Sequence, residues 1–147
     1  MFKTIVVAVD GSGHAQKAVD LAADLAQKYD AQLLLLSVYK HVSALETTHT
    51  LVNPKDAVGP ENPTLRDIAN SIIATTGVRA TERGAPKVET YVKRGHPARV
   101  IVDFAKEKGA DAIIMGSRGL GDIGGFLLGS VSHKVNSLAE CTCITVK

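Results

Sequence analysis

The chain has 147 residues and a mass of 15.5 kDa, the size of one ordinary domain, so we expect residues 1–147 to form a single domain. Hydrophobic residues make up 45% and charged residues 22%, which is typical of soluble globular proteins rather than of disordered chains. Aromatic residues make up only 4% and the net charge is +2, so nucleic-acid binding, which uses base stacking and a strong basic field, is disfavoured.

Apolar runs and helix signals alternate along the chain. A strand is expected at residues 5–9, where five apolar residues follow one another. Ser12 is a suitable N-cap for a helix whose apolar residues continue at helical spacing to Tyr29. The elements expected after it are a strand at 33–38, a helix at 65–73, a strand at 88–92, a helix from 97 to 105 ended by Gly109, a strand at 112–115, a helix at 131–138 and a strand at 143–146.

This alternation predicts an α/β fold: a doubly wound, Rossmann-like parallel sheet of five strands with helices on both faces. The runs at 88–92 and 143–146 are shorter and alternate more than the other three. The first suits an edge strand, and the second could leave one face free for a partner. The long segment at about 40–63 interrupts the pattern and predicts a lid, a binding loop or a mobile segment. Its His41 and His49 are interpreted as solvated histidines, with a ligand role as the alternative.

The expected compartment is the cytoplasm. No run reaches the roughly 18 apolar residues of a membrane span, and the run at 5–9 is too short for a signal peptide. Cys141 and Cys143 would share one face of a strand, a poor arrangement for a disulfide, so we expect reduced packing residues. A metal site that joins them to His133 lacks further ligands at suitable spacing.

The segment 115–132 carries most of the functional information, because six glycines in fourteen residues lie between a buried strand and a helix. Ligands of α/β sheets bind at the carboxyl ends of strands, where a helix N-terminus offers free N–H groups to an anion. Glycines let the backbone approach phosphate oxygens, Ser130 adds a hydroxyl and Arg118 adds a cation. A flexible glycine loop without a ligand is the alternative interpretation.

Two common phosphate motifs fit this segment poorly. Gly119-x-Gly121-x-x-Gly124 matches the dinucleotide pattern as a string, but that pattern belongs after the first strand and directly before a helix. Gly124-x4-Gly129-Ser130 is similar to a P-loop, but Ser130 stands where the phosphate-binding lysine is required. A conventional Rossmann dehydrogenase or Walker-type ATPase is therefore disfavoured.

A third spacing fits without gaps. Gly116-x2-Gly119-x9-Gly129-Ser130 resembles the nucleotide-binding signature of the universal stress protein family, in its ATP-binding branch. Four more segments resemble the family pattern and extend the resemblance over essentially the whole chain: IVVAVDGS at 5–12, GHPA at 95–98, ADAIIMGSRG at 110–119 and CITV at 143–146. The resemblance implies the strand order 3-2-1-4-5, with the site between the first and fourth strands. Strand connections diverge there, which is where ligands of such sheets generally bind.

The resemblance also implies a set of contacts to an adenine nucleotide (ATP, with AMP or ADP as alternatives). Asp10 would face the ribose or a metal-bound water, with Mg²⁺ held mainly by the phosphates. Ala8 and Val38 would lie beside the adenine, with the Val38 backbone as its hydrogen-bonding group. Met115 and Gly116 would line the sugar and base side. The phosphates would be surrounded by Ser117, Arg118, Gly119, Gly129, Ser130 and Val131. Asp10 also suits an ordinary N-terminal turn residue, which stays an open alternative.

Three functions are compatible with these residues. The favoured one is an ATP-binding regulatory protein of the stress response with little or no hydrolysis, because Asp122 is the only evident second carboxylate near the glycines. The resemblance implies dimers or higher homo-oligomers joined through the last strand, and a regulated protein partner such as a transporter or kinase. The alternatives are a slow ATPase or adenylyl-transfer enzyme, and a nucleotide-free interaction oligomer. His96 and His133, at expected helix starts, are interpreted as capping or surface residues rather than catalytic ones.

Overall fold

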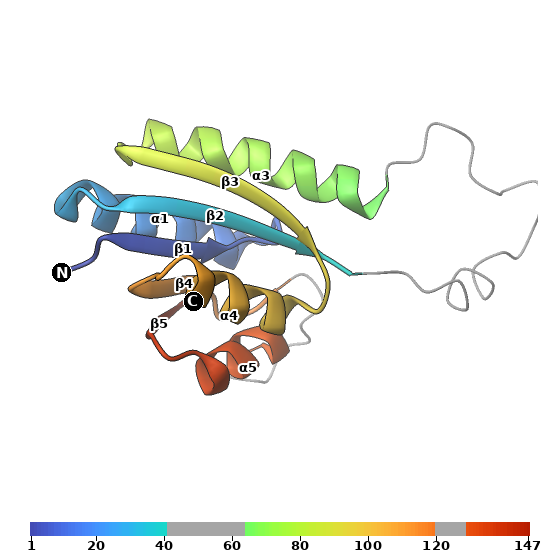
Figure 1. Cartoon of the computed structure of the whole chain (residues 1–147). Helices are drawn as coiled ribbons and strands as arrows, with labels where there is room; N and C mark the ends of the chain where they lie inside the picture. Colours follow the sequence, from blue (N-terminus) through green and yellow to red (C-terminus); the bar gives the residue numbers. More distant parts are fainter. Residues whose placement is uncertain (41–63, 120–128) are drawn as a thin grey trace, which may run out of the picture.

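The computed structural model describes residues 1–40, 64–119 and 129–147. These residues form a five-stranded parallel sheet of order β3-β2-β1-β4-β5 with four helices (Figure 1). The elements are β1 (Thr4–Ala8), α1 (Gly13–Tyr29), β2 (Gln32–Tyr39), α3 (Leu65–Glu82), β3 (Lys87–Arg94), α4 (Pro97–Glu107), β4 (Ala112–Gly116), α5 (Ser130–Leu138) and β5 (Thr142–Val146). The predicted fold class and strand order are confirmed.

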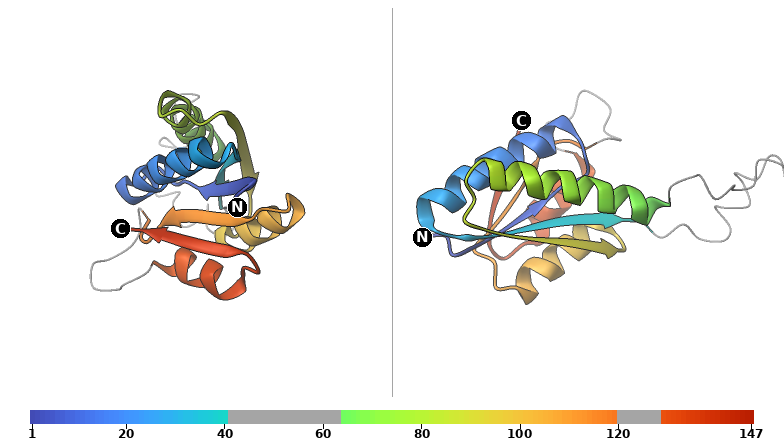
Figure 2. Two further views of the ribbon diagram at one scale, coloured as in Figure 1. Left: turned by 90° about the vertical axis from the view of Figure 1, so that its left-hand side faces the viewer. Right: turned by 90° about the horizontal axis from the view of Figure 1, so that it is seen from above.

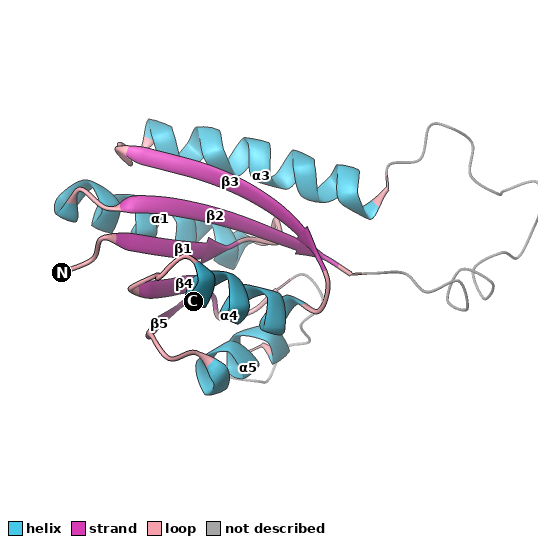
Figure 3. Ribbon diagram, in the orientation of Figure 1, coloured by secondary structure: helices cyan, strands magenta, loops and turns pink. Residues whose placement is uncertain are grey.

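The helices cover both faces of the sheet, as Figures 2 and 3 show. Side chains alternate along each strand, so neighbouring residues enter different cores. In β1, Ile5 and Val7 pack in the core with α1 and α3, whereas Val6 packs in the core with α4 and α5. Because the three central strands are buried on both faces, they read as continuous apolar runs in the sequence.

Two helix starts follow the expected local signals. The Ser12 side chain caps α1 by accepting a hydrogen bond from the Ala15 N–H, and Pro97 occupies the first turn of α4. His96 is the N-cap of α4 but makes no side-chain cap bond, and His133 is an exposed residue in the first turn of α5. His96 therefore has the predicted position without the capping bond.

The predicted helix at 65–73 is nine residues too short, because α3 continues to Glu82. The residues beyond 73 include threonines and a glycine, which are weak helix formers. In the structure the hydroxyls of Thr75, Thr76 and Thr81 donate to the carbonyls four residues earlier. At the other end, Thr64 and Asp67 form a reciprocal capping box. These bonds and packing on the sheet keep the sequence helical.

β3 and β5 are the two edges of the sheet, which confirms the edge predicted at 88–92 and agrees with the strand order that the resemblance implies. Cys141 and Cys143 are free cysteines, and both are partly buried against the core with α4 and α5, as expected of small packing residues. Burial raises the pKa of both thiols above the usual range, which keeps them protonated and unreactive near neutral pH.

Candidate functional site

A cavity of about 370 Å³ lies at the carboxyl ends of β1, β2 and β4, where the chain leaves β1 and β4 in different directions. Its volume falls in the range of small-molecule sites. Nine of the eleven predicted binding residues line it: Ala8, Asp10, Val38, Met115, Gly116, Arg118, Gly119, Ser130 and Val131. The cavity therefore brings together residues from four separate segments of the chain.

One side of the cavity is apolar. Ala8 and Met115, neighbours in the β1–β4 register, form part of it together with side chains of β2 and α4. The Leu36 carbonyl accepts a hydrogen bond from Val9, and the Tyr39 carbonyl accepts one from Gly95 on the opposite side of β2. Since backbone direction alternates along a strand, the N–H and C=O of Val38 face the β1 side, beyond the end of β1. This orientation offers a donor and an acceptor to a planar ring.

The other side of the cavity is polar and basic. Arg118, two residues after the end of β4, brings a cationic side chain to the lining, and Ser130 is the first residue of α5. Lys40, directly after β2, adds a second cation near the strand that carries Val38. Gly129, the N-cap of α5, has no side chain to bond the N–H groups of the first helical turn. Because a helix N-terminus attracts negative charge, this end of the cavity suits an anion such as a phosphate group.

The turn after β1 presents the one carboxylate among the described lining residues. Asp10 Oδ1 accepts a hydrogen bond of 2.9 Å from the Ser12 N–H, which holds the carboxylate next to the N-terminus of α1. Gly11 adopts φ +85°, a left-handed conformation that glycine takes without strain. Asp10 therefore acts as a turn residue, which was the alternative interpretation of its place in the sequence. It also lines the cavity, so the two interpretations are compatible.

Ser117 and Gly129 do not line the cavity but lie behind it. Ser117 is 1% exposed, its N–H donates to the Val146 carbonyl, and its carbonyl accepts from the Gly129 N–H and the Ser132 hydroxyl. Its own hydroxyl lies 3.0 Å from His14 Nδ1. Direct phosphate contact by Ser117 and Gly129 stays a prediction, and the geometry gives both residues a supporting place.

Several lining residues were not predicted from the sequence: Val9, Ser12, Ala15, Leu36, Lys40, Pro97, Ile101 and Ser132. Ser12 and Ser132 are two residues away from the predicted Asp10 and Ser130, so their hydroxyls could have been predicted as further polar groups of the site. Nothing in the sequence places the first turn of α4 beside β2, because that approach depends on tertiary packing. His41, His49, Asp122 and the glycines at 121, 124 and 125 lie outside the described residues, as does most of the predicted 40–63 loop.

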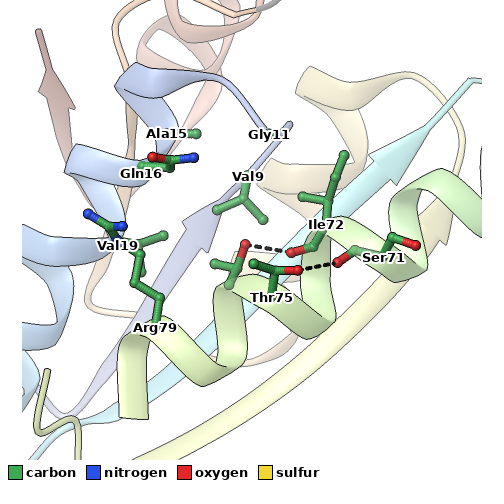
Figure 4. A pocket seen from close by; sticks show the side chains of 10 residues that line it. Val9, Gly11, Ala15, Gln16, Val19, Ser71, Ile72, Thr75 and Arg79 are labelled. Atoms are coloured by element: carbon green, nitrogen blue, oxygen red, sulfur yellow. Dashed lines mark hydrogen bonds between the residues drawn. The ribbon is translucent and has the colours of Figure 1, made fainter. Parts of the chain in front are cut away.

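A second cavity, of about 280 Å³, lies between α1 and α3 on the other face of the sheet (Figure 4). Val9 and Ala15 belong to the walls of both cavities. The Ile72 side chain of α3 packs against Gly11, where a Cβ would lie 3.3 Å from Ile72 Cδ1. The second cavity therefore borders the same turn that carries Asp10.

Within residues 1–40, 64–119 and 129–147, no three His, Cys, Asp or Glu side chains are grouped as metal ligands. Mg²⁺ is usually held by one or two carboxylates together with substrate phosphates, so a single carboxylate at a phosphate-binding end fits that mode. No helix in the described part of the chain is long and apolar enough to cross a membrane.

Comparisons with known proteins identify the family. The sequence model of the universal stress protein family matches residues 1–147. The chain is 35% identical to universal stress protein YxiE of Bacillus subtilis over 151 residues, with 100% of both chains covered. Because the match spans the whole chain, this protein belongs to the universal stress protein family.

Two solved structures are similar to this chain. A universal stress protein in complex with cAMP has a TM-score of 0.72 and 29% identity, with 99% of this chain and 96% of that chain covered. A structure described as hypothetical protein MJ0577 has a TM-score of 0.80 and 26% identity, with 100% and 96% covered. Both share the doubly wound fold along nearly their full length.

Proposed function

We propose that this protein is an ATP-binding regulatory protein of the stress response. Nucleotide occupancy changes its oligomeric or partner-binding state, with little or no hydrolysis. The observation that carries the proposal is the cavity at the ends of β1 and β4, which has an apolar side, a basic side and the N-terminus of α5. A ligand with a flat apolar ring at one end and phosphates at the other matches this division.

The base and sugar of the nucleotide are assigned to the apolar side. Ala8, Val38 and Met115 provide contact surface there, and the backbone of Val38 provides both hydrogen-bonding groups that an adenine edge needs. Gly116 lines the cavity where the sugar is assigned, and the Asp10 carboxylate, which also lines it, can accept from ribose hydroxyls. The similar universal stress protein bound to cAMP supports an adenine nucleotide as the ligand class.

The phosphates are assigned to the basic side. Arg118 offers charge-assisted hydrogen bonds, and the first-turn N–H groups of α5 add dipolar attraction. Gly119 lines the same side, and its lack of a side chain permits a close backbone approach. Mg²⁺ would be held mainly by the phosphates, with Asp10 as the nearest carboxylate of the chain.

Little hydrolysis is expected because the lining is poor in groups for phosphoryl transfer. Such transfer needs a bound metal, charge stabilisation and a group that orients the attacking water. Asp10 is the only carboxylate among the described lining residues, and it is already engaged by the Ser12 N–H. The slow ATPase or adenylyl-transfer alternative predicts multiple turnovers with radiolabelled ATP, lost in the Asp10→Ala variant. That result would replace the regulatory proposal.

Regulation is assigned to the edge strand β5, through which two copies would join. The main chain connects this edge to the cavity, because Ser117 donates its N–H to Val146 and accepts from Gly129 at the start of α5. A shift of the backbone at Gly129 when phosphates bind would therefore reach Val146 of β5 through the two hydrogen bonds of Ser117. A regulated partner, for example a transporter or kinase, would bind the same surface or one created by dimer formation.

A nucleotide-release assay tests the proposal. Purified protein is denatured and the supernatant is analysed for adenine nucleotides, and stripped protein is titrated with ATP, AMP, cAMP and adenosine by calorimetry. We expect ATP to bind, and light scattering with and without ATP to show a shift in oligomeric mass. Absence of released nucleotide together with absence of binding would leave the nucleotide-free interaction oligomer as the function. ATP binding without any change in mass or partner binding would contradict the regulatory mechanism alone.

A further inference from the structure

His14 is a half-buried side chain that does not line the cavity, yet it contacts the segment leading to the phosphate side. Its Nδ1 atom lies 3.0 Å from the Ser117 hydroxyl, across 103 residues of sequence. His14 is the second residue of α1, so this contact joins the first turn of α1 to the end of β4.

The two segments that this contact joins both contribute residues to the cavity lining. Ser12 and Ala15 come from the start of α1, whereas Gly116 and Arg118 lie on either side of Ser117. The His14–Ser117 hydrogen bond therefore links the start of α1 to the end of β4 without lining the cavity itself; we call this link the brace.

Ser117 transmits the brace to the phosphate side through its backbone. Its carbonyl accepts hydrogen bonds from the Gly129 N–H and from the Ser132 hydroxyl at 2.9 Å, so it sets where α5 begins. Because Ser117 is 1% exposed, its hydroxyl has no water to replace a lost protein partner. Loss of the His14 bond leaves a buried hydroxyl to find a new partner, and the turn before Arg118 rotates with it.

We propose that His14 is a positioning residue that, through Ser117, fixes the phosphate side of the cavity and so favours nucleotides over nucleosides. The inference rests on the proposed nucleotide site and extends it. The adenine side lies among β1, β2 and α4, away from the brace, so adenosine affinity depends little on His14. The brace acts on the group of residues that only a phosphorylated ligand reaches.

The test compares ATP and adenosine affinities of His14→Ala, His14→Asn and Ser117→Ala by calorimetry. We expect His14→Ala to weaken ATP binding by about three- to tenfold, the usual effect of one lost buried hydrogen bond, and to change adenosine binding less than about twofold. His14→Asn retains a short hydrogen-bonding side chain and should recover most of the ATP affinity. In the Ser117→Ala background, His14→Ala should have no further effect, because the coupling partner is already gone.

Thermal unfolding of each variant separates positioning from general destabilisation. Equal losses for ATP and adenosine, failure of His14→Asn to recover ATP affinity, or additive effects of the two alanine variants would each overturn the role of His14. If the unchanged chain binds neither ligand, the proposed function fails and the inference fails with it. These outcomes are distinguishable because only the last involves the unsubstituted protein.

Discussion

Gly116 at the end of β4 lies directly against His14 in the first turn of α1. A Cβ at position 116 would lie 2.7 Å from His14 Cβ and 2.8 Å from the His14 carbonyl carbon, far inside normal contact distance. The glycine thus permits the start of α1 to pack on the strand end that forms the cavity. Its place in the glycine signature has a structural reason in addition to the sugar contact proposed for it.

The Gly116→Ala variant tests this contact. The new methyl group pushes α1 away from β4, so we expect a loss of about 1–3 kcal/mol in the free energy of unfolding, measured in urea, and weaker ATP binding. Gly13→Ala is the matched control, because nothing lies within 4 Å of a Cβ at position 13 of the same helix. Similar stability of the two variants would contradict the packing argument.

Arg118 is expected to act on the charge of the ligand. Arg118→Gln removes a cation from the phosphate side and leaves a shorter, uncharged polar side chain, so ATP affinity should fall about tenfold and adenosine affinity should not change. The effect should shrink at 0.5 M salt, because screening weakens the lost attraction.

Arg99→Gln is the control for Arg118, since Arg99 is exposed on α4 outside the cavity lining. Calorimetry at two salt concentrations measures both variants. If Arg99→Gln weakened ATP binding as much as Arg118→Gln, the attraction would be a property of the net charge rather than of the cavity.

A proline substitution on the free edge of β5 can test dimer formation without disturbing the fold. Val146 directs its carbonyl toward β4, where it accepts from the Ser117 N–H, so Thr145 directs its N–H away from the sheet. Thr145→Pro removes that outward donor and leaves the β4–β5 ladder intact, because proline is tolerated on sheet edges. We expect light scattering to show monomers and circular dichroism to show the unchanged fold.

Ile144→Pro is the contrasting variant, because the N–H of Ile144 faces β4 and its loss breaks the ladder itself. It should lower the unfolding temperature, which Thr145→Pro should barely change. A dimer that persists in the Thr145→Pro variant would place the subunit contact somewhere other than the β5 edge.

Acid should destabilise the fold through Asp111 and Asp20. The Thr4 and Lys3 N–H groups donate to the Asp111 carboxylate at 2.8 and 2.7 Å and lower its pKa, and Arg79 lowers the pKa of Asp20 through a hydrogen bond of 2.7 Å. A lowered pKa means that the folded state prefers the charged carboxylate. The stabilisation is therefore full above the unfolded pKa of about 3.9 and is lost as pH falls through the lower folded value.

Urea unfolding at pH 5.5 and pH 3 measures this effect. Asp111→Asn should cost about 1 kcal/mol at pH 5.5 and less at pH 3, because pH 3 lies below the unfolded-state pKa of about 3.9, where the preference of the folded state for the charged carboxylate contributes less. Asp103, an exposed carboxylate on α4, gives the control variant Asp103→Asn. An equal cost of Asp111→Asn at both pH values would show that its charge does not stabilise the fold.

Local patterns were enough to predict most of the fold. Continuous apolar runs marked β1, β2 and β4, Ser12 and Pro97 marked two helix starts, and alternation marked β3 as an edge strand. These signals depend on neighbours along the chain, so one sequence contains them. The second half of α3 escaped prediction because its threonines are poor helix formers by propensity, and their bonds to carbonyls four residues earlier appear only once the helix exists.

The sequence by itself determined the chemistry at the ends of β1 and β4, since the glycine signature and Asp10 are local features. Only the tertiary structure decided which of the signature residues line the cavity and which are buried outside its lining. Ser117 and Gly129 belong to the signature, yet β5 and α5 bury them, and Ile101 enters the lining from α4, whose packing beside the cavity no local pattern predicts. Contacts such as His14–Ser117 join residues 103 positions apart, and folding alone brings such pairs within hydrogen-bonding distance.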